Sequence, residues 1–225
     1  MVKKKLKSLL ASLSKARYIK NIYLTTSLTF KKKRQLLSPS LDHIRHATLE
    51  LCCEEIIEKN IKGNVAELGV YRGHFAASIN QVFPDRKLYL FDTFEGFASS
   101  DIAIEKNGKF STGEQDFSDT TIEKVMKKMT HPENCIFKKG FFPDTAADVD
   151  DTFCFVSIDT DLFQPIYSGL NFFYPRLVNG GYIFVHDFNN EFYKGAKKAV
   201  GQFCQEQRIN YVPLPDSGGT VIIIK

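Results

Sequence analysis

The chain has 225 residues, of which 43% are hydrophobic and 25% charged, and its formal net charge is +4. This length and composition fit one globular domain with a full hydrophobic core and a short appendage. No apolar run approaches the roughly 18 residues that a membrane-spanning helix requires. We therefore expect no transmembrane segment, and we predict a cytoplasmic location.

The basic residues are concentrated at the N-terminus. Residues 1–41 contain eleven Lys and Arg and no Asp or Glu, whereas the chain as a whole has 30 basic and 26 acidic side chains. We predict a basic N-terminal extension over residues 1–43 and a folded domain over residues 44–225. The extension could contact an anionic surface, an acidic substrate or the domain itself, or it could be a solvated segment.

The five cysteines show neither a disulfide framework nor the spacing of a metal site. Two are adjacent and the other three are scattered among apolar residues: Cys52, Cys53, Cys135, Cys154 and Cys204. Reduced, buried thiols are typical of cytosolic proteins.

The hydrophobic pattern alternates between strands and helices along the predicted domain. Strands are expected at residues 64–70, 87–93, 135–140, 153–159 and 182–187, and helices at 46–59, 74–83, 118–129, 164–174 and 192–207. The aperiodic stretch 94–117 is expected to be a functional loop. Such alternation predicts a mostly parallel sheet with helices on both faces.

Two further strands, at about 210–214 and 220–225, are separated by the turn residues Asp216-Ser217-Gly218-Gly219. This pattern favours a hairpin. A mostly parallel seven-stranded sheet that ends in an antiparallel hairpin is the Rossmann-like α/β fold of class I S-adenosylmethionine (SAM) methyltransferases, which is the fold class we predict.

The first strand is followed by the loop E-L-G-V-Y-R-G, residues 67–73. Gly69 would allow a tight turn against a ligand, and Gly73 would let the next helix begin close to the sheet. A helix N-terminus here favours an anion such as the carboxylate of a methionine moiety, with Glu67 facing its amino group. The G-x-x-x-G spacing differs from the dinucleotide pattern G-x-G-x-x-G.

An acidic residue ends the second predicted strand. Asp92 follows the first loop by about 25 positions, where an acidic side chain can accept hydrogen bonds from ribose hydroxyl groups. The alternative is a turn or helix-capping role.

Further carboxylates end the fourth and fifth predicted strands. Asp159 and Asp161 flank one residue, and Asp187 follows His186. Carboxylates that lie this close tolerate burial if a cation is bound beside them, and oxygen ligands suit Mg²⁺. Asp161 is the candidate general base. Alternatively, these aspartates are exposed residues that cap the following helices.

Six motifs together resemble the macrocin O-methyltransferase family, over about residues 64–203. They are VAELGVYRGHFA, LYLFDTFEGF, KKGFFPDT, FVSIDTDLFQP, YPRLVNGGYIFVHDF and KGAKKAV. The resemblance implies S-adenosylmethionine as methyl donor, a divalent metal such as Mg²⁺, and a hydroxyl of a sugar or other small molecule as acceptor. It implies no nucleic-acid substrate, and we expect a homo-oligomer.

The resemblance also implies roles for individual residues. Asp161 would be the catalytic base, and Asp159, Asp187 and His186 would bind the metal. The implied cofactor-binding residues are Glu67, Leu68, Gly69, Tyr71, Gly73, Asp92, Thr93, Gly140 and Asp159. One position departs from the family pattern. Characterised antibiotic-tailoring members have an Asp-Asp pair where this chain has His186-Asp187. Either His186 binds a softer metal, or the site has fewer protein ligands.

Other functions are less consistent with the sequence. A catechol-type O-methyltransferase typically has an Asp-Asn pair where this chain has Asp187-Phe188. A nicotinamide oxidoreductase lacks its glycine pattern, and base methylation lacks an Asn/Asp-Pro-Pro-aromatic motif. A non-catalytic binding protein of the same fold would have no need of three strand-end aspartates. A catechol-type or other small-molecule O-methyltransferase remains the main alternative.

Overall fold

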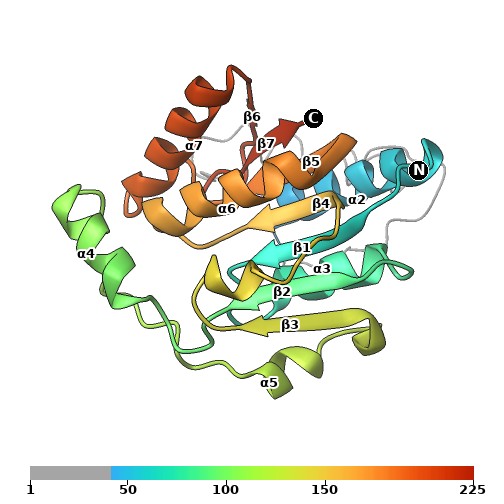
Figure 1. Ribbon diagram of the computed structural model, residues 1–225, viewed down its shortest axis with the longest axis horizontal. Coiled ribbons are helices and arrows are strands. Elements are labelled where there is room, and N and C mark those ends of the chain that lie inside the picture. The colour runs from blue at the N-terminus through green and yellow to red at the C-terminus, as the bar shows by residue number, and fades with distance from the viewer. Residues whose placement is uncertain (1–41) are drawn as a thin grey trace, which may run out of the picture. The chain divides into compact units, whose positions relative to one another are not determined.

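The computed structural model describes residues 42–225, and the predicted basic extension lies almost entirely outside this range. Within it, a central sheet carries helices on both faces (Figure 1). No helix among these residues is both long enough and apolar enough to cross a membrane.

The sheet has seven strands in the order β3-β2-β1-β4-β5-β7-β6. Strands β1 to β5 run parallel, and β7 is antiparallel to both β5 and β6. Their bounds are β1 Asn64–Leu68, β2 Leu88–Asp92, β3 Cys135–Lys139, β4 Phe153–Ile158, β5 Leu177–Val185, β6 Val212–Pro213 and β7 Val221–Ile224. This arrangement confirms the predicted mostly parallel sheet with an antiparallel C-terminal end.

Six α-helices and two short 3₁₀ helices connect the strands of the described residues. Their bounds are α2 His43–Glu58, α3 His74–Val82, α4 Ser99–Asn107, α5 Ile122–Met126, α6 Phe163–Arg176, α7 Lys194–Gln207, η1 Pro132–Asn134 and η2 Asp144–Ala146. Helices α6 and α7 pack on one face of the sheet, and α2 and α3 pack on the other (Figure 1).

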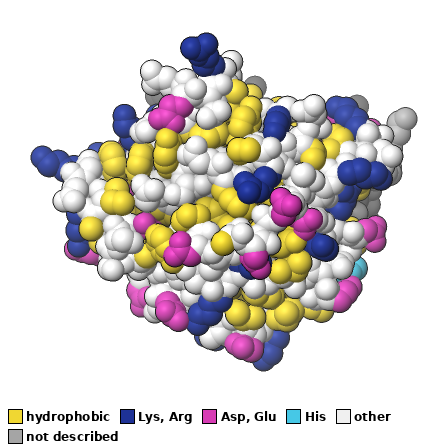
Figure 2. All heavy atoms as spheres, in the orientation of Figure 1, with side chains coloured by type: hydrophobic (Ala, Val, Ile, Leu, Met, Phe, Trp, Pro, Cys, Tyr) yellow, Lys and Arg dark blue, Asp and Glu magenta, His cyan; other side chains and the backbone are white. Residues whose placement is uncertain are grey.

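Each face of the sheet therefore has its own hydrophobic core. The buried strand β4 serves both, because successive side chains of a strand point to opposite faces. Val156 and Ile158 pack toward α6 and α7, whereas Phe155 packs toward α2 and α3. On the molecular face that Figure 2 shows, basic and acidic side chains are interspersed with exposed hydrophobic ones.

Helix α4 lies within residues 94–117, where the sequence analysis expected a loop, and that expectation was wrong. The helix has no clear apolar stripe, so the sequence pattern gave no signal for it. Its anchor is Glu105, a fully buried carboxylate. Glu105 accepts hydrogen bonds from the Phe163 backbone N–H at 3.0 Å and from the Ser111 hydroxyl at 3.1 Å. Tertiary contacts thus stabilise a helix that local propensity does not favour.

Three predicted boundaries also shift. The helix predicted over residues 118–129 is the shorter α5, Ile122–Met126. Thr121 caps it by accepting a hydrogen bond from the Lys124 N–H at 3.3 Å. Pro175 lies in the last turn of α6 instead of after it. The pair Gly180-Gly181 lies inside β5, which begins at Leu177, and not in a turn before that strand.

Candidate functional site

A cavity of about 240 Å³ opens at the carboxyl ends of β1, β2, β4 and β5. Aromatic rings form much of its wall, and carboxylates from three strand ends and from α4 face it. Its lining comprises Leu68, Gly69, Tyr71, Phe91, Asp92, Thr93, Gly96, Phe97, Ala98, Asp101, Phe117, Gly140, Phe141, Phe142, Asp159, Thr160, Asp161, Pro165, His186 and Asp187. Every residue predicted for the site except Glu67 and Gly73 lies on this wall.

Gly69 turns the backbone sharply at the end of β1, with a φ of +86°. A Cβ atom at this position would lie 2.1 Å from the backbone oxygen of Asp159, so only glycine fits. The Gly69 N–H donates to the Phe91 carbonyl at 2.9 Å. Gly69 thus makes a tight turn at the cavity wall, packed against the end of β4.

Asp92 holds this loop in place. One carboxylate oxygen accepts from the backbone N–H groups of Val70 and Tyr71, at 2.7 and 2.8 Å, and the other from Phe94 at 2.6 Å. The turn role and the ribose role are therefore compatible, because each carboxylate oxygen can accept more than one hydrogen bond. Asp92 braces the loop while it faces the cavity.

Glu67 and Gly73 do not reach the cavity wall. Glu67 is 1% exposed, since the alternation of β1 directs its side chain toward α2. Burial raises the pKa of Glu67 well above its usual value, against the opposing effect of the nearby Arg45 charge. Gly73 precedes α3, and a Cβ there would lie 2.6 Å from the side chain of Val125. Both residues support the loop from behind.

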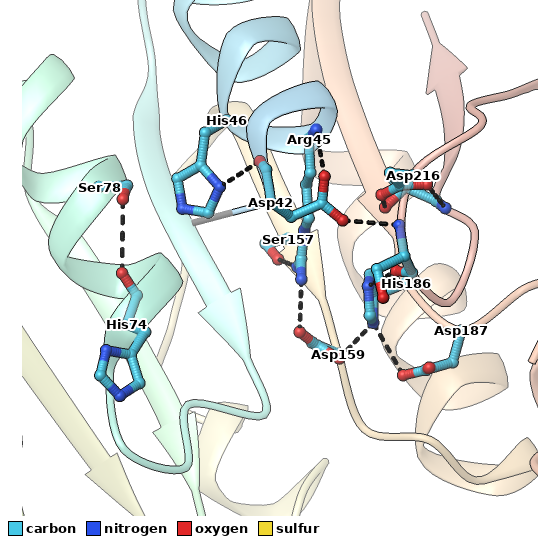
Figure 3. A network of polar contacts seen from close by, with 12 residues as sticks. Asp42, Arg45, His46, His74, Ser78, Ser157, Asp159, His186, Asp187 and Asp216 are labelled. Carbon is cyan, nitrogen blue, oxygen red and sulfur yellow. Dashed lines mark hydrogen bonds and ion pairs between the residues drawn. The ribbon is translucent and has the colours of Figure 1, made fainter. Parts of the chain in front are cut away.

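Arg45, on the first turn of α2, is a residue of the charged network that the sequence analysis missed. It is 6% exposed, and its guanidinium donates to Asp159 at 2.8 Å and to the Ser157 hydroxyl at 3.1 Å (Figure 3). The guanidinium also stacks on the Phe75 ring, 3.8 Å from its centre. The helical spacing in the sequence could have indicated its burial, because Arg45 lies four residues before the core residue Leu49 and so continues the buried face of the helix.

Asp159 is the centre of a charged network. Burial raises its pKa, but the charges of Arg45 and then His186 outweigh burial and hold the pKa below its usual range. One carboxylate oxygen contacts Arg45, and the other lies 3.2 Å from His186 Nδ1. The side chain is therefore an ionised carboxylate that two cations neutralise.

His186 lies between acceptors on both sides of its ring (Figure 3). Its Nδ1 is 2.9 Å from Asp187, and its Nε2 is 2.8 Å from the Ser217 carbonyl oxygen. The Ser217 N–H in turn donates to Asp42, the capping residue of α2, at 2.6 Å. Burial lowers the pKa of His186, but the charge of Asp159 outweighs it and raises the pKa to about 10.

Asp161 and Asp187 occupy unusual backbone conformations at the ends of β4 and β5. Their φ angles are +59° and +58°, a region that residues other than glycine rarely adopt and that recurs at functional sites. Asn190 donates to Asp187 at 2.8 Å. Burial, and then the charges of Asp187 and Asp159, raise the pKa of Asp161 well above its usual value.

Three of these residues form a possible ligand set for a metal ion. Asp159, His186 and Asp187 each offer one donor atom, and these atoms lie within 4.8 Å of one another. One ion can reach all three at ordinary ligand distances. The donor set therefore fits a divalent metal, provided that His186 Nδ1 gives up its proton and the contacts it makes with the two carboxylates.

Comparison with known families now identifies the chain. The family model described as Macrocin-O-methyltransferase (TylF) matches residues 40–216, which is most of the sequence and includes the whole cavity wall. The chain belongs to this family. The resemblance predicted from the six sequence motifs is thus confirmed.

Individual relatives are distant members or neighbours in fold. Demethyldecarbamoylnovobiocin O-methyltransferase of Streptomyces niveus is 24% identical over 156 residues, which span 64% of this chain and 60% of that protein. The solved structure of the O-methyltransferase NovP is 21% identical with a TM-score of 0.65, and the match covers 80% and 79% of the two chains.

A second solved structure is the calicheamicin methyltransferase CalS11. It is 16% identical with a TM-score of 0.63, over 80% of this chain and 78% of that one. A further structure of CalS11 is described as that of a TDP-rhamnose 3′-O-methyltransferase. The likeness to NovP and CalS11 confirms the predicted class I methyltransferase fold of this chain.

Proposed function

We propose that the protein transfers the methyl group of S-adenosylmethionine to a hydroxyl of a sugar or glycosylated natural product, with a divalent metal. The observation that carries this proposal is the convergence of Gly69, Asp92, Asp159, Asp161 and Asp187 on one strand-end cavity in a member of the macrocin O-methyltransferase family. The novobiocin and calicheamicin relatives support a sugar or natural-product acceptor.

The β1–β2 side of the cavity suits the methyl donor. The backbone at Gly69 can approach the methionine portion closely, and Asp92 can accept from ribose hydroxyls while it braces the loop. The ring of Phe141, which lines the cavity and is 37% exposed, offers an apolar surface for an adenine base. We assign Leu68, Tyr71, Thr93 and Gly140 to the same binding surface; Glu67 and Gly73 would act behind it.

The β4–β5 side suits the acceptor. Asp159, His186 and Asp187 would hold the metal, which would supply positive charge to orient the acceptor hydroxyl and favour its ionisation. Asp161 would take the hydroxyl proton. Burial keeps Asp161 a weak acid in the free protein, so cationic groups beside it are needed to make it an effective base at neutral pH. The remaining contribution is positioning of the two reactants.

The first test of the proposed function is calorimetric titration of S-adenosylhomocysteine into the purified protein, with NAD as control ligand. We expect micromolar binding of the homocysteine product and none of NAD. Methyl transfer from S-adenosylmethionine to TDP-rhamnose and to catechol then separates a sugar O-methyltransferase from a catechol-type one. A folded protein that binds no S-adenosylhomocysteine would contradict the proposed function.

A second prediction concerns the metal. His186→Asp restores the carboxylate pair of the family and removes the imidazole proton that competes with a cation, so we expect it to tighten Mg²⁺ binding at least about tenfold. Calorimetry with Mg²⁺ alone, on protein saturated with S-adenosylhomocysteine, measures this. His131→Asp, at the opposite end of the strands, is the matched control. Metal assistance would be contradicted if wild type and His186→Asp both bound neither Mg²⁺ nor Mn²⁺.

The cellular setting stays a prediction. We propose a cytoplasmic location, which suits five cysteines that form no disulfide within residues 42–225. The expected homo-oligomer is testable by light scattering on the purified chain.

A further inference from the structure

We propose that Asp101, on α4, determines acceptor specificity by accepting a hydrogen bond from a second hydroxyl of a polyhydroxylated acceptor, beside the hydroxyl that reacts. This inference rests on the proposed function and extends it to a residue outside the strand-end motifs. Its basis is a buried carboxylate that faces the catalytic cavity and has no partner among the described residues.

Asp101 is 6% exposed and lines the same cavity as Asp161 and Asp187. Among residues 42–225 its carboxylate accepts no hydrogen bond and forms no ion pair, although other buried carboxylates such as Asp159 and Glu105 have partners. Burial of a charged group without a partner costs free energy, and such groups are concentrated at functional sites. What the Asp101 carboxylate lacks is a donor, and the cavity is where a ligand can supply one.

The position of Asp101 is fixed relative to the catalytic carboxylates. Glu105, one helical turn further along α4, accepts from the backbone N–H of Phe163, which follows Asp161 by two residues. The Lys194 N–H, at the start of α7, donates to the Phe110 carbonyl at 3.2 Å and holds the segment that follows α4. Helix α4 is thus attached to the beginnings of both α6 and α7, so Asp101 belongs to a defined wall and not to a free loop.

The chemistry of this wall selects hydroxyl groups. Burial, and then the charge of Glu105, raise the pKa of Asp101 to about 6, so at neutral pH it is mainly an ionised acceptor. An ionised Asp101 disfavours an anionic group at this point of the cavity. The ring of Phe97 lines the same cavity and offers apolar surface for the C–H face of a sugar ring. A ring that carries adjacent hydroxyls fits both features.

The deciding experiment uses full-length protein saturated with S-adenosylhomocysteine. Calorimetry measures binding of TDP-rhamnose, its monodeoxy analogues and simple methyl glycosides to wild type, Asp101→Asn and the control Asp85→Asn, an exposed aspartate at the amino end of β2. We expect Asp101→Asn to weaken sugar binding at least about tenfold, because sites built to bind a hydroxyl discriminate strongly when the pair is broken. S-adenosylhomocysteine binding should stay within about twofold, as no charge–charge contact to that ligand is removed.

The analogues make the assignment specific. One monodeoxy sugar should bind wild type more weakly than the intact sugar does. The same two sugars should bind Asp101→Asn with equal affinity, because the variant already lacks the charged acceptor for the missing hydroxyl. Thermal unfolding serves as the folding control, and Asp101→Asn should unfold at the same or a higher temperature near pH 7.5. Unchanged sugar affinity in Asp101→Asn overturns the proposal. So does wild type that binds S-adenosylhomocysteine but no sugar, whereas failure to bind S-adenosylhomocysteine counts against the proposed function itself.

Discussion

Asp161→Asn should reduce kcat by about 10²–10⁴-fold, the usual contribution of a positioned general base, while it leaves S-adenosylhomocysteine binding unchanged. The substitution keeps the shape of the side chain and removes its ability to take a proton. Because the pKa of Asp161 is raised by burial and by Asp187 and Asp159, the wild-type rate should fall on acidification from above the usual pKa of a carboxyl group. The variant should lose that dependence on pH.

Rates with a sugar acceptor, measured from pH 5 to pH 9, check this prediction. Asp150→Asn is the matched control, since Asp150 is an exposed aspartate outside the cavity. A variant at Asp161 with near wild-type turnover would remove this residue from the mechanism. Loss of S-adenosylhomocysteine binding along with turnover would instead indicate a role in the shape of the cavity.

Arg45→Ala should lower the free energy of unfolding by about 3 kcal/mol, at the lower end of the range for breaking one partner out of a buried ion pair. The Arg45 and Asp159 side chains are 7% and 24% exposed, so little solvent is available to replace the lost contact. The variant also leaves the Ser157 hydroxyl without its donor and Phe75 without the stacked guanidinium. Urea unfolding at pH 7 measures the change.

The pH dependence of this loss has a defined sign. The pKa of Asp159 is depressed in the folded protein, so its contribution to stability is present above the usual value of 3.8 and is lost as the pH falls below it. The difference between wild type and Arg45→Ala should therefore narrow in acid. Lys59→Ala, at the C-terminal end of the same helix, is the control, because Lys59 and Glu55 form an exposed ion pair that contributes little to stability. Equal effects of the two substitutions would contradict the structural role of Arg45.

Strands β1, β2 and β4 were predictable because each is a short apolar run that ends at a glycine or a carboxylate. Such a run forms a buried strand largely independently of the residues after it. Helix α4 was not predictable in this way, since its stability depends on Glu105 reaching the N–H of Phe163, more than 50 positions away. Local sequence carries no information about a partner at that distance.

The same distinction applies to the site. Asp159, Asp161 and Asp187 could be placed together because parallel strands bring their carboxyl ends to one edge. Arg45 contacts Asp159 from α2, and Asp101 faces the cavity from α4; the strand pattern does not specify which helical residues reach this edge. The motif position of Glu67 suggested the ligand surface, whereas the alternation of β1 buries its side chain behind the loop.

The contact between Asp42 and Ser217 has a practical consequence for shortened forms of the protein. Asp42 caps α2, where Arg45 resides, and it also fixes the turn before β7, whose Ser217 carbonyl holds the imidazole of His186. A truncation that begins at residue 43 would keep every helix and strand from α2 to β7 and every residue of the cavity wall. It would nevertheless remove the hydrogen bond that joins the start of α2 to the turn before β7, where both elements support the charged network. A shortened form of the domain therefore has to retain Asp42.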